Sequence, residues 1–301
     1  MLSYKKVFFY LVIVLSVSPN SFIHGQPVKK FNQMTYAEID ELIRQTAKTS
    51  MTVNEKMNYF SAYFLGVPYN IHCVGDGPYA LYEPWPLVNF KETNCMAFCE
   101  HVLALAISDN WDNFFNNLQQ IRYKEGLIGM KTRNHYTMAD WLPQNSWLLE
   151  DVSTKVGESY TKTVTRTISH RQFFAEKGIS DTTYTLPDRT LSIDYIPLDD
   201  CFNVINKLET GDILSLIFAK LDNIFSAHLV MVVDAGNGML IRESSNSKMT
   251  TFDTPIKEWI EQKINLKSRR YLGITIMRIN KEINLPGKII DPINIKDIKK
   301  N

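Results

Sequence analysis

The sequence has almost no net charge, with 33 lysines and arginines against 32 aspartates and glutamates. Two of the basic residues, Lys5 and Lys6, are the only charged residues before Pro27, and without them the balance is 31 against 32. Proteins that bind nucleic acid generally carry a basic face. The composition therefore gives no indication of a nucleic-acid partner.

The N-terminal apolar run is too short to span a membrane. It covers residues 7–15, follows two lysines and is soon interrupted at Pro19, whereas a membrane-spanning helix needs about 20 apolar residues. A charged start, a short apolar run and then small or polar residues are typical of a secretory signal peptide. We therefore expect residues 1–25 to be a signal peptide and the mature protein to be periplasmic or secreted, without stable membrane insertion.

The remaining residues, 26–301, contain no internal repeat, low-complexity tract or long linker rich in proline and glycine. A chain of this length can bury one large core, so a single domain is predicted. Cysteine is scarce, with four residues: Cys73, Cys95, Cys99 and Cys201. In an exported protein they could form two disulfides, but at most one bridge remains if Cys95 is a working thiol.

Helical patterns dominate the first half of the sequence. Residues 35–38 and 52–55 are capping boxes, in which a threonine and a glutamate three residues later satisfy the first N–H groups of a helix. The second of these helices is expected to end at Gly66. A third box, at residues 137–140, predicts another short helix. Further helices are expected after Asn94 and over residues 111–121.

Strand patterns dominate the second half. Segments rich in β-branched and apolar residues, bounded by turn residues, predict strands at residues 164–168, 191–196, 213–218, 228–233, 239–243 and 271–279. A series of helices followed by a series of strands favours an α+β fold with an antiparallel sheet.

One cysteine lies where a helix is expected to begin. Residues 102–107 are apolar on every side, which predicts a helix buried all round, and Asn94 is a favourable N-cap for a helix starting at Cys95. The unpaired N–H groups there lower the pKa of a thiol, so Cys95 is predicted to be a nucleophile. The alternative, a small apolar core residue, fits Cys99 better.

A thiolate nucleophile needs a base, and His228 is the best placed of the six histidines. It opens a segment that is apolar on both faces, residues 229–233, which is typical of a central strand. His101, in contrast, lies on a different face of the helix from Cys95. The alternative for His228 is a core histidine satisfied by hydrogen bonds.

A third group should orient the imidazole of His228. Residues 234–238 form a turn signal between two strands. A loop with an even number of residues would place Glu243 on the face of the sheet that carries His228, one or two cross-strand neighbours away. An odd loop would place Arg242 and Ser244 there instead, and Glu243 would then be a solvated surface residue.

Six short motifs follow one another along the chain. They are Gly66-Val67-Pro68-Tyr69, residues 94–106, Ile121-Arg122-Tyr123, Arg133-Asn134-His135-Tyr136 with Asp140-Trp141, Gly211-Asp212-Ile213 and Ala227-His228-Leu229. In this order they resemble the bacterial DUF1460 family, N-acetylmuramoyl-L-alanine amidase-like proteins of the NlpC/P60 (papain-like) superfamily. The likeness spans most of the mature chain.

The resemblance implies a papain-like core, in which a buried helix starting with the nucleophilic cysteine packs on an antiparallel sheet. Cys95 matches the nucleophile and His228 the base, while Glu243 falls where many members carry a histidine. Tyr69 matches a tyrosine that sits beside the nucleophile and can help to hold the oxyanion. Asn94 replaces the usual aspartate, which keeps the N-cap but removes a charge beside the thiol.

The resemblance also implies hydrolysis of peptidoglycan muropeptides without a metal or cofactor. A polar and aromatic cluster is expected to bind the sugar or the peptide: Asn134, His135, Tyr136, Asp140 and Trp141. Trp141 could equally be a core residue. Three functions remain open, namely an amidase that cuts between N-acetylmuramic acid and L-alanine, a stem-peptide cysteine endopeptidase, and a secreted wall-binding or host-directed protein without turnover.

Overall fold

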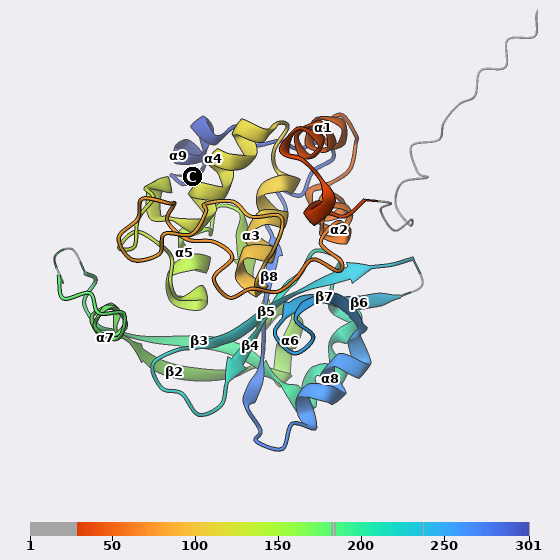
Figure 1. Cartoon of the computed structure of the whole chain (residues 1–301). Coiled ribbons are helices and arrows are strands. Elements are labelled where there is room, and N and C mark those ends of the chain that lie inside the picture. Colours follow the sequence, from red (N-terminus) through yellow and green to blue (C-terminus); the bar gives the residue numbers. More distant parts are fainter. Residues whose placement is uncertain (1–28, 182, 184, 237, 301) are drawn as a thin grey trace, which may run out of the picture.

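The computed structural model describes residues 29–181, 183, 185–236 and 238–300, so the predicted signal peptide lies outside the described residues. Helices come first along the chain and strands later (Figure 1). The helices are α1 (Tyr36–Ala47), α2 (Val53–Ala62), α3 (Cys95–Ala106), α4 (Trp111–Arg122), α5 (Leu142–Gln144), α6 (Ser153–Gly157), α7 (His170–Glu176), α8 (Ile256–Ile264) and α9 (Ile295–Ile298).

The strands form one antiparallel sheet. They are β1 (Leu149–Asp151), β2 (Lys162–Ile168), β3 (Arg189–Pro197), β4 (Ile213–Phe218), β5 (Ser226–Asp234), β6 (Met239–Ser245), β7 (Thr250–Pro255) and β8 (Tyr271–Ile279). Their order in the sheet is β2-β3-β8-β4-β5-β6-β7, and β1 pairs with β8 beside this path. Strand β5 is therefore flanked on both sides, by β4 and β6, as the apolar pattern of residues 229–233 predicts.

Helices cover both faces of the sheet (Figure 1). Helices α1 to α5 lie on one face and bury a large core there, to which β5 contributes Leu229, Met231 and Val233. Helices α6 and α8 lie on the other face, over a second core that includes Val230 and Val232. The alternation of side chains along β5 divides its residues between these two cores.

The capping boxes at Thr35 and Thr52 are confirmed, because both threonine side chains accept hydrogen bonds from the N–H group three residues later. Helix α2 ends at Ala62 rather than Gly66, because residues 63–66 form a turn in which Gly66 adopts a φ of 80°. The six predicted strands are present within a few residues of their expected bounds. Strand β7 and helix α8 have no counterpart in the sequence prediction.

The predicted box at residues 137–140 is wrong. A π-helical turn covers Thr137–Trp141, and its N-cap is Tyr136, which makes no side-chain capping bond. Asp140 instead accepts a hydrogen bond from the backbone N–H of Tyr136 (3.1 Å) and forms ion pairs with His170 and Arg189. The Asp140 carboxylate is therefore engaged by His170 and Arg189 as well as by the Tyr136 N–H, and Thr137 does not cap the turn.

All four cysteines are free thiols, so neither of the two possible disulfides is formed. Within the ranges given above, every helix is too short or too polar to cross a membrane.

Candidate active site

Helix α3 presents Cys95 at its first position. The Asn94 side chain caps the helix by accepting a hydrogen bond from the N–H of Ala97 (2.9 Å), as predicted, and it donates one to the carbonyl of Ile71 (3.1 Å). From Ala97 to Ala106 every residue of the helix is buried. Cys95 therefore lies at the positive end of a helix that is shielded from water, while its own side chain is partly exposed.

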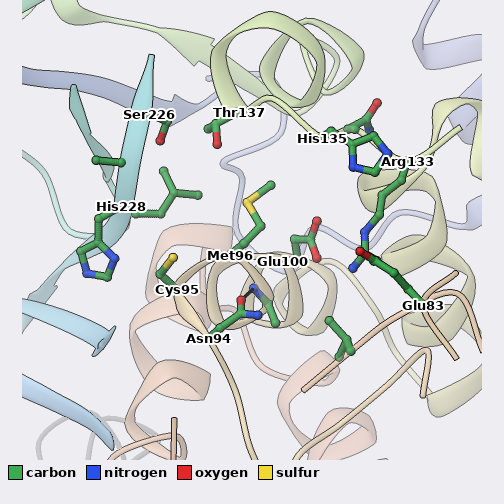
Figure 2. A pocket seen from close by; sticks show the side chains of 15 residues that line it. Glu83, Asn94, Cys95, Met96, Glu100, Arg133, His135, Thr137, Ser226 and His228 are labelled. Atoms are coloured by element: carbon green, nitrogen blue, oxygen red, sulfur yellow. Dashed lines mark hydrogen bonds and ion pairs between the residues drawn. The ribbon is translucent and has the colours of Figure 1, made fainter. Parts of the chain in front are cut away.

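His228 faces this thiol from strand β5 (Figure 2). Burial by itself would raise the pKa of Cys95, but the charge on His228 and hydrogen bonds from its ring and from the N–H groups of Leu229 and Met96 outweigh burial and lower that pKa below its ordinary value. Burial opposes the charge on His228 too, yet Cys95 and Glu243 raise its pKa to about 9. These opposite shifts favour a thiolate–imidazolium pair.

The other three cysteines differ from Cys95 in this respect. Burial raises the pKa of Cys73 and of Cys201 to about 12, and that of Cys99 well above its ordinary value. Their thiols stay protonated at neutral pH, so Cys95 is the one cysteine of the chain with the properties of a nucleophile.

Glu243 lies on the face of the sheet that carries His228. Val232 pairs with Ile241, and four residues separate Asp234 from Met239, so the loop is even, and alternation places Glu243 and His228 on the same face. The distance from His228 Nε2 to Glu243 Oε2 is 2.7 Å. The predicted contact is confirmed. Because Nε2 is occupied, Nδ1 is the ring nitrogen left for the sulfur.

Two residues of helix α8 hold the Glu243 carboxylate from the other side. Trp259 Nε1 donates a hydrogen bond to Glu243 Oε1 (3.2 Å), and Lys263 Nζ lies 3.8 Å from the same oxygen. Burial would raise the pKa of Glu243, but His228, Lys263 and Trp259 together lower it. The carboxylate is therefore ionised and fixed beneath the imidazole, although it is only 2 % exposed.

Tyr69 reaches the same place from a loop. Its backbone N–H donates to the carbonyl of Met249 (3.0 Å), and it pairs as an isolated bridge with Thr93, two residues before Cys95. Burial, and then the charges of Cys95 and Cys73, raise the pKa of the Tyr69 phenol. A protonated hydroxyl close enough to sense the thiolate is a suitable hydrogen-bond donor beside it.

A cavity of about 270 Å³ opens in front of Cys95 and His228. Asn134 and His135 line it, as the sequence predicts, together with Thr137 and Ser226. Figure 2 shows Cys95 and His228 at one end and Arg133 with Glu83 at the other. The thiol is therefore accessible to a ligand that occupies the cavity.

The other predicted substrate-binding residues do not line this cavity. Trp141 is completely buried in the main core, so the alternative reading of Trp141 as a core residue is the correct one. Tyr136 is also largely buried there, at 8 % exposure. Asp140 is engaged by Arg189 (2.6 Å) and His170 (2.8 Å) and stabilises the turn. All three residues stabilise the fold and do not line the cavity.

The sequence prediction missed several residues of the site. Trp259 and Lys263 escaped because helix α8 was not predicted. Arg133 and Glu100 also line the cavity, and Arg122 forms a buried ion pair with Glu100 (2.7 Å). An arginine between the apolar residues Ile121 and Tyr123 is the sequence signal that could have indicated this pair. Within the described ranges, no three side chains of His, Cys, Asp or Glu gather in a way that could hold a metal ion.

Comparison with known proteins finds one matching family and several similar solved structures. A family model described as N-acetylmuramoyl-L-alanine amidase-like matches residues 59–266. No curated protein sequence matches the chain. A DUF1460 protein of Legionella pneumophila shares 20 % identity, with a TM-score of 0.76 over 85 % of this chain and 96 % of that one.

Two further solved structures share the fold. An N-acetylmuramoyl-L-alanine amidase from Bacteroides uniformis is 22 % identical, with a TM-score of 0.59 over 76 % of this chain and 99 % of that one. A Bacteroides fragilis protein described as a candidate xylanase is 21 % identical, with a TM-score of 0.55 over 72 % and 98 % of the two chains. At these identities the similarity concerns the fold alone.

Proposed function

Because the chain belongs to the N-acetylmuramoyl-L-alanine amidase-like family, we propose that it hydrolyses the amide bond between N-acetylmuramic acid and L-alanine in peptidoglycan muropeptides. The observation that carries this proposal is the line of three groups, Cys95, His228 and Glu243, at the end of an accessible cavity. A nucleophile, a base and an orienting carboxylate in this arrangement are what acyl transfer by a cysteine hydrolase requires.

The same arrangement supports membership of the papain-like NlpC/P60 superfamily. In this proposal α3 is the nucleophile helix, packed on the antiparallel sheet that carries the base on β5. The neighbours of the Cys95 thiol lower its pKa and so favour the thiolate, which is an activation that does not require a metal or cofactor.

The first half of the reaction forms a thioester. The Cys95 thiolate attacks the carbonyl carbon of the lactyl group, and the N–H groups at the start of α3, with the Tyr69 hydroxyl, donate to the oxyanion that develops. One such donor is worth about 3 kcal/mol of transition-state stabilisation. The intermediate then collapses: the C–N bond breaks, and His228 gives its proton to the departing amine of L-alanine.

The second half restores the enzyme. Neutral His228 takes one proton from water, the hydroxide attacks the thioester carbonyl, and the C–S bond breaks to release the Cys95 thiolate and the muramic acid carboxylic acid, which loses its remaining proton to solvent. His228 keeps the proton and returns to the imidazolium form. Glu243 stabilises that positive charge throughout, since it remains ionised beside Nε2.

Mass spectrometry of digested muropeptides tests the proposed bond. Free stem peptides, starting with L-alanine, together with peptide-free N-acetylmuramic acid are expected as products. Shortened stems still attached to the sugar would show a stem-peptide endopeptidase instead, and unchanged muropeptides would show a protein without turnover. Either of these results would contradict the proposal.

The proposed substrate also supports the proposed location. Peptidoglycan lies outside the bacterial cytoplasmic membrane, so an enzyme that acts on it is expected in the periplasm or the medium after its signal peptide, residues 1–25, is removed. N-terminal sequencing of protein recovered from these fractions is expected to give a start between about residues 20 and 30.

Changes at Glu243 are expected to lower turnover without abolishing it. Glu243→Ala removes the charge beside the imidazolium, and an orienting group of this kind contributes less than the nucleophile or the base. We expect a loss of about 10²-fold in kcat, and a smaller loss for Glu243→Gln because the amide oxygen still accepts the ring N–H bond. Wild-type turnover in Glu243→Ala would contradict the orienting role.

A further inference from the structure

The far end of the cavity is formed by Arg133, whose position is fixed by its neighbours. Its Nη1 atom lies 2.6 Å from Glu83 Oε2 and 3.5 Å from Asp76 Oδ1, and the guanidinium lies 6.0 Å from the centre of the Tyr123 ring. Lys177 contacts the other oxygen of Glu83 (3.2 Å). These contacts hold one end of the guanidinium while its side chain remains 16 % exposed.

The rest of the guanidinium is unused. Among the described residues, Arg133 Nε and Nη2 have no hydrogen-bond partner, and Arg133 lines the same cavity as Cys95 (Figure 2). The nearby Arg122 differs, because it is 1 % exposed and its Nε and Nη1 atoms donate to Glu100 and to the carbonyl of Leu87. The Nε–Nη2 edge of an arginine matches the two oxygens of a carboxylate.

We propose that Arg133 binds a carboxylate of the substrate's peptide and selects for it. This inference rests on the proposed function, which makes L-alanine the leaving side. The acidic residue after L-alanine continues the stem through its side-chain carboxyl, which leaves its α-carboxylate free to reach Arg133. Glu83 and Glu100 each have a cation of their own, Lys177 and Arg122, and Asp76 accepts a hydrogen bond from the Tyr123 hydroxyl (2.7 Å). Each of these carboxylates therefore has a partner besides Arg133 when the substrate anion binds.

Two ligands that differ at one group test the proposal. N-acetylmuramoyl-L-alanyl-D-glutamate carries the α-carboxylate, and the corresponding D-isoglutamine compound carries an amide there. Calorimetry with Cys95→Ala protein, which retains the cavity without turnover, is expected to give at least tenfold tighter binding of the acid, because a charge-assisted pair is replaced by a neutral contact in the amide.

Variants at Arg133 identify the group responsible. In the Cys95→Ala background, Arg133→Gln is expected to weaken binding of the acid by about 10- to 100-fold and to change the affinity for the amide by no more than about twofold. The affinity of the Arg133→Lys variant for the acid is expected to lie between those of the Arg133 and Arg133→Gln proteins, since lysine keeps the charge but lacks the edge with two N–H donors. Lys131→Gln is the matched control, because it removes a neighbouring cation that pairs with Asp181 and does not line the cavity, and both ligands should bind unchanged.

Equal binding of acid and amide by the Cys95→Ala protein, absent binding of the acid, or equal weakening of both ligands by Arg133→Gln would overturn the proposal. Hydrolysis of the same two compounds by the unsubstituted enzyme separates this result from the proposed function. Hydrolysis without preference would contradict only the role of Arg133. A preference in binding without hydrolysis would contradict only the proposed bond.

Discussion

Cys95→Ala is expected to abolish muropeptide hydrolysis, with kcat reduced by about 10⁴-fold or more. No other thiol in the chain has a lowered pKa or contacts His228, so no side chain can replace the nucleophile. The protein should still fold, because Cys95 is partly exposed and the cap of α3 is supplied by Asn94. Release of free stem peptides measures the activity, and thermal unfolding measures the fold.

Cys99→Ala is the matched control for this change. Cys99 lies one turn further along α3 and is completely buried, so its replacement removes one packed sulfur atom and is expected to cost about 1 kcal/mol of stability. Turnover should remain close to that of the wild type. Activity that survives Cys95→Ala and is lost in Cys99→Ala would identify Cys99 as the nucleophile and contradict the proposed mechanism.

His228→Ala is expected to lower kcat by about 10³-fold or more, since the proton donor and acceptor is removed and the thiol loses the charge that lowers its pKa. Alkylation of Cys95 by iodoacetamide reports the second effect independently of turnover. At pH 6 the wild-type thiol is expected to react at least about tenfold faster than the His228→Ala thiol, because the charge on His228 lowers the pKa of Cys95 and raises the fraction of thiolate.

The pH dependence of wild-type turnover follows from the same pair. Activity should rise with pH as Cys95 ionises, at a pH below that of an ordinary thiol, and should fall as His228 loses its proton near pH 9, because neutral imidazole cannot protonate the leaving amine. Folding raises the pKa of His228 from about 6.5 in the unfolded chain to about 9. The resulting contribution to the free energy of unfolding is fully present below about pH 6.5 and is lost as the pH rises through 9. Equal alkylation rates of Cys95 in wild type and His228→Ala at pH 6 would contradict the proposed effect of His228 on the pKa of Cys95.

Local patterns in the sequence determined a large part of the site. The cap at Asn94, the apolar run after Cys95 and the apolar run after His228 depend on neighbours within a few residues, and all three have the predicted local structure. The contact of Glu243 with His228 was one of two alternatives that the sequence left open, and the observed four-residue loop decides between them because its even length fixes the register of the two strands.

Only the tertiary structure decided what surrounds these groups. Trp259 reaches Glu243 from a helix that follows the unpredicted strand β7, and Arg133 faces the cavity because Glu83 and Asp76, about 50 residues away, hold it there. Trp141 and Asp140 carry the residue types of a binding site, but the packing of α7 and β3 against them assigns them to the core and to buried ion pairs. Side-chain spacing reports contacts within one helix or hairpin, whereas burial and ion pairing between distant segments depend on how those elements pack.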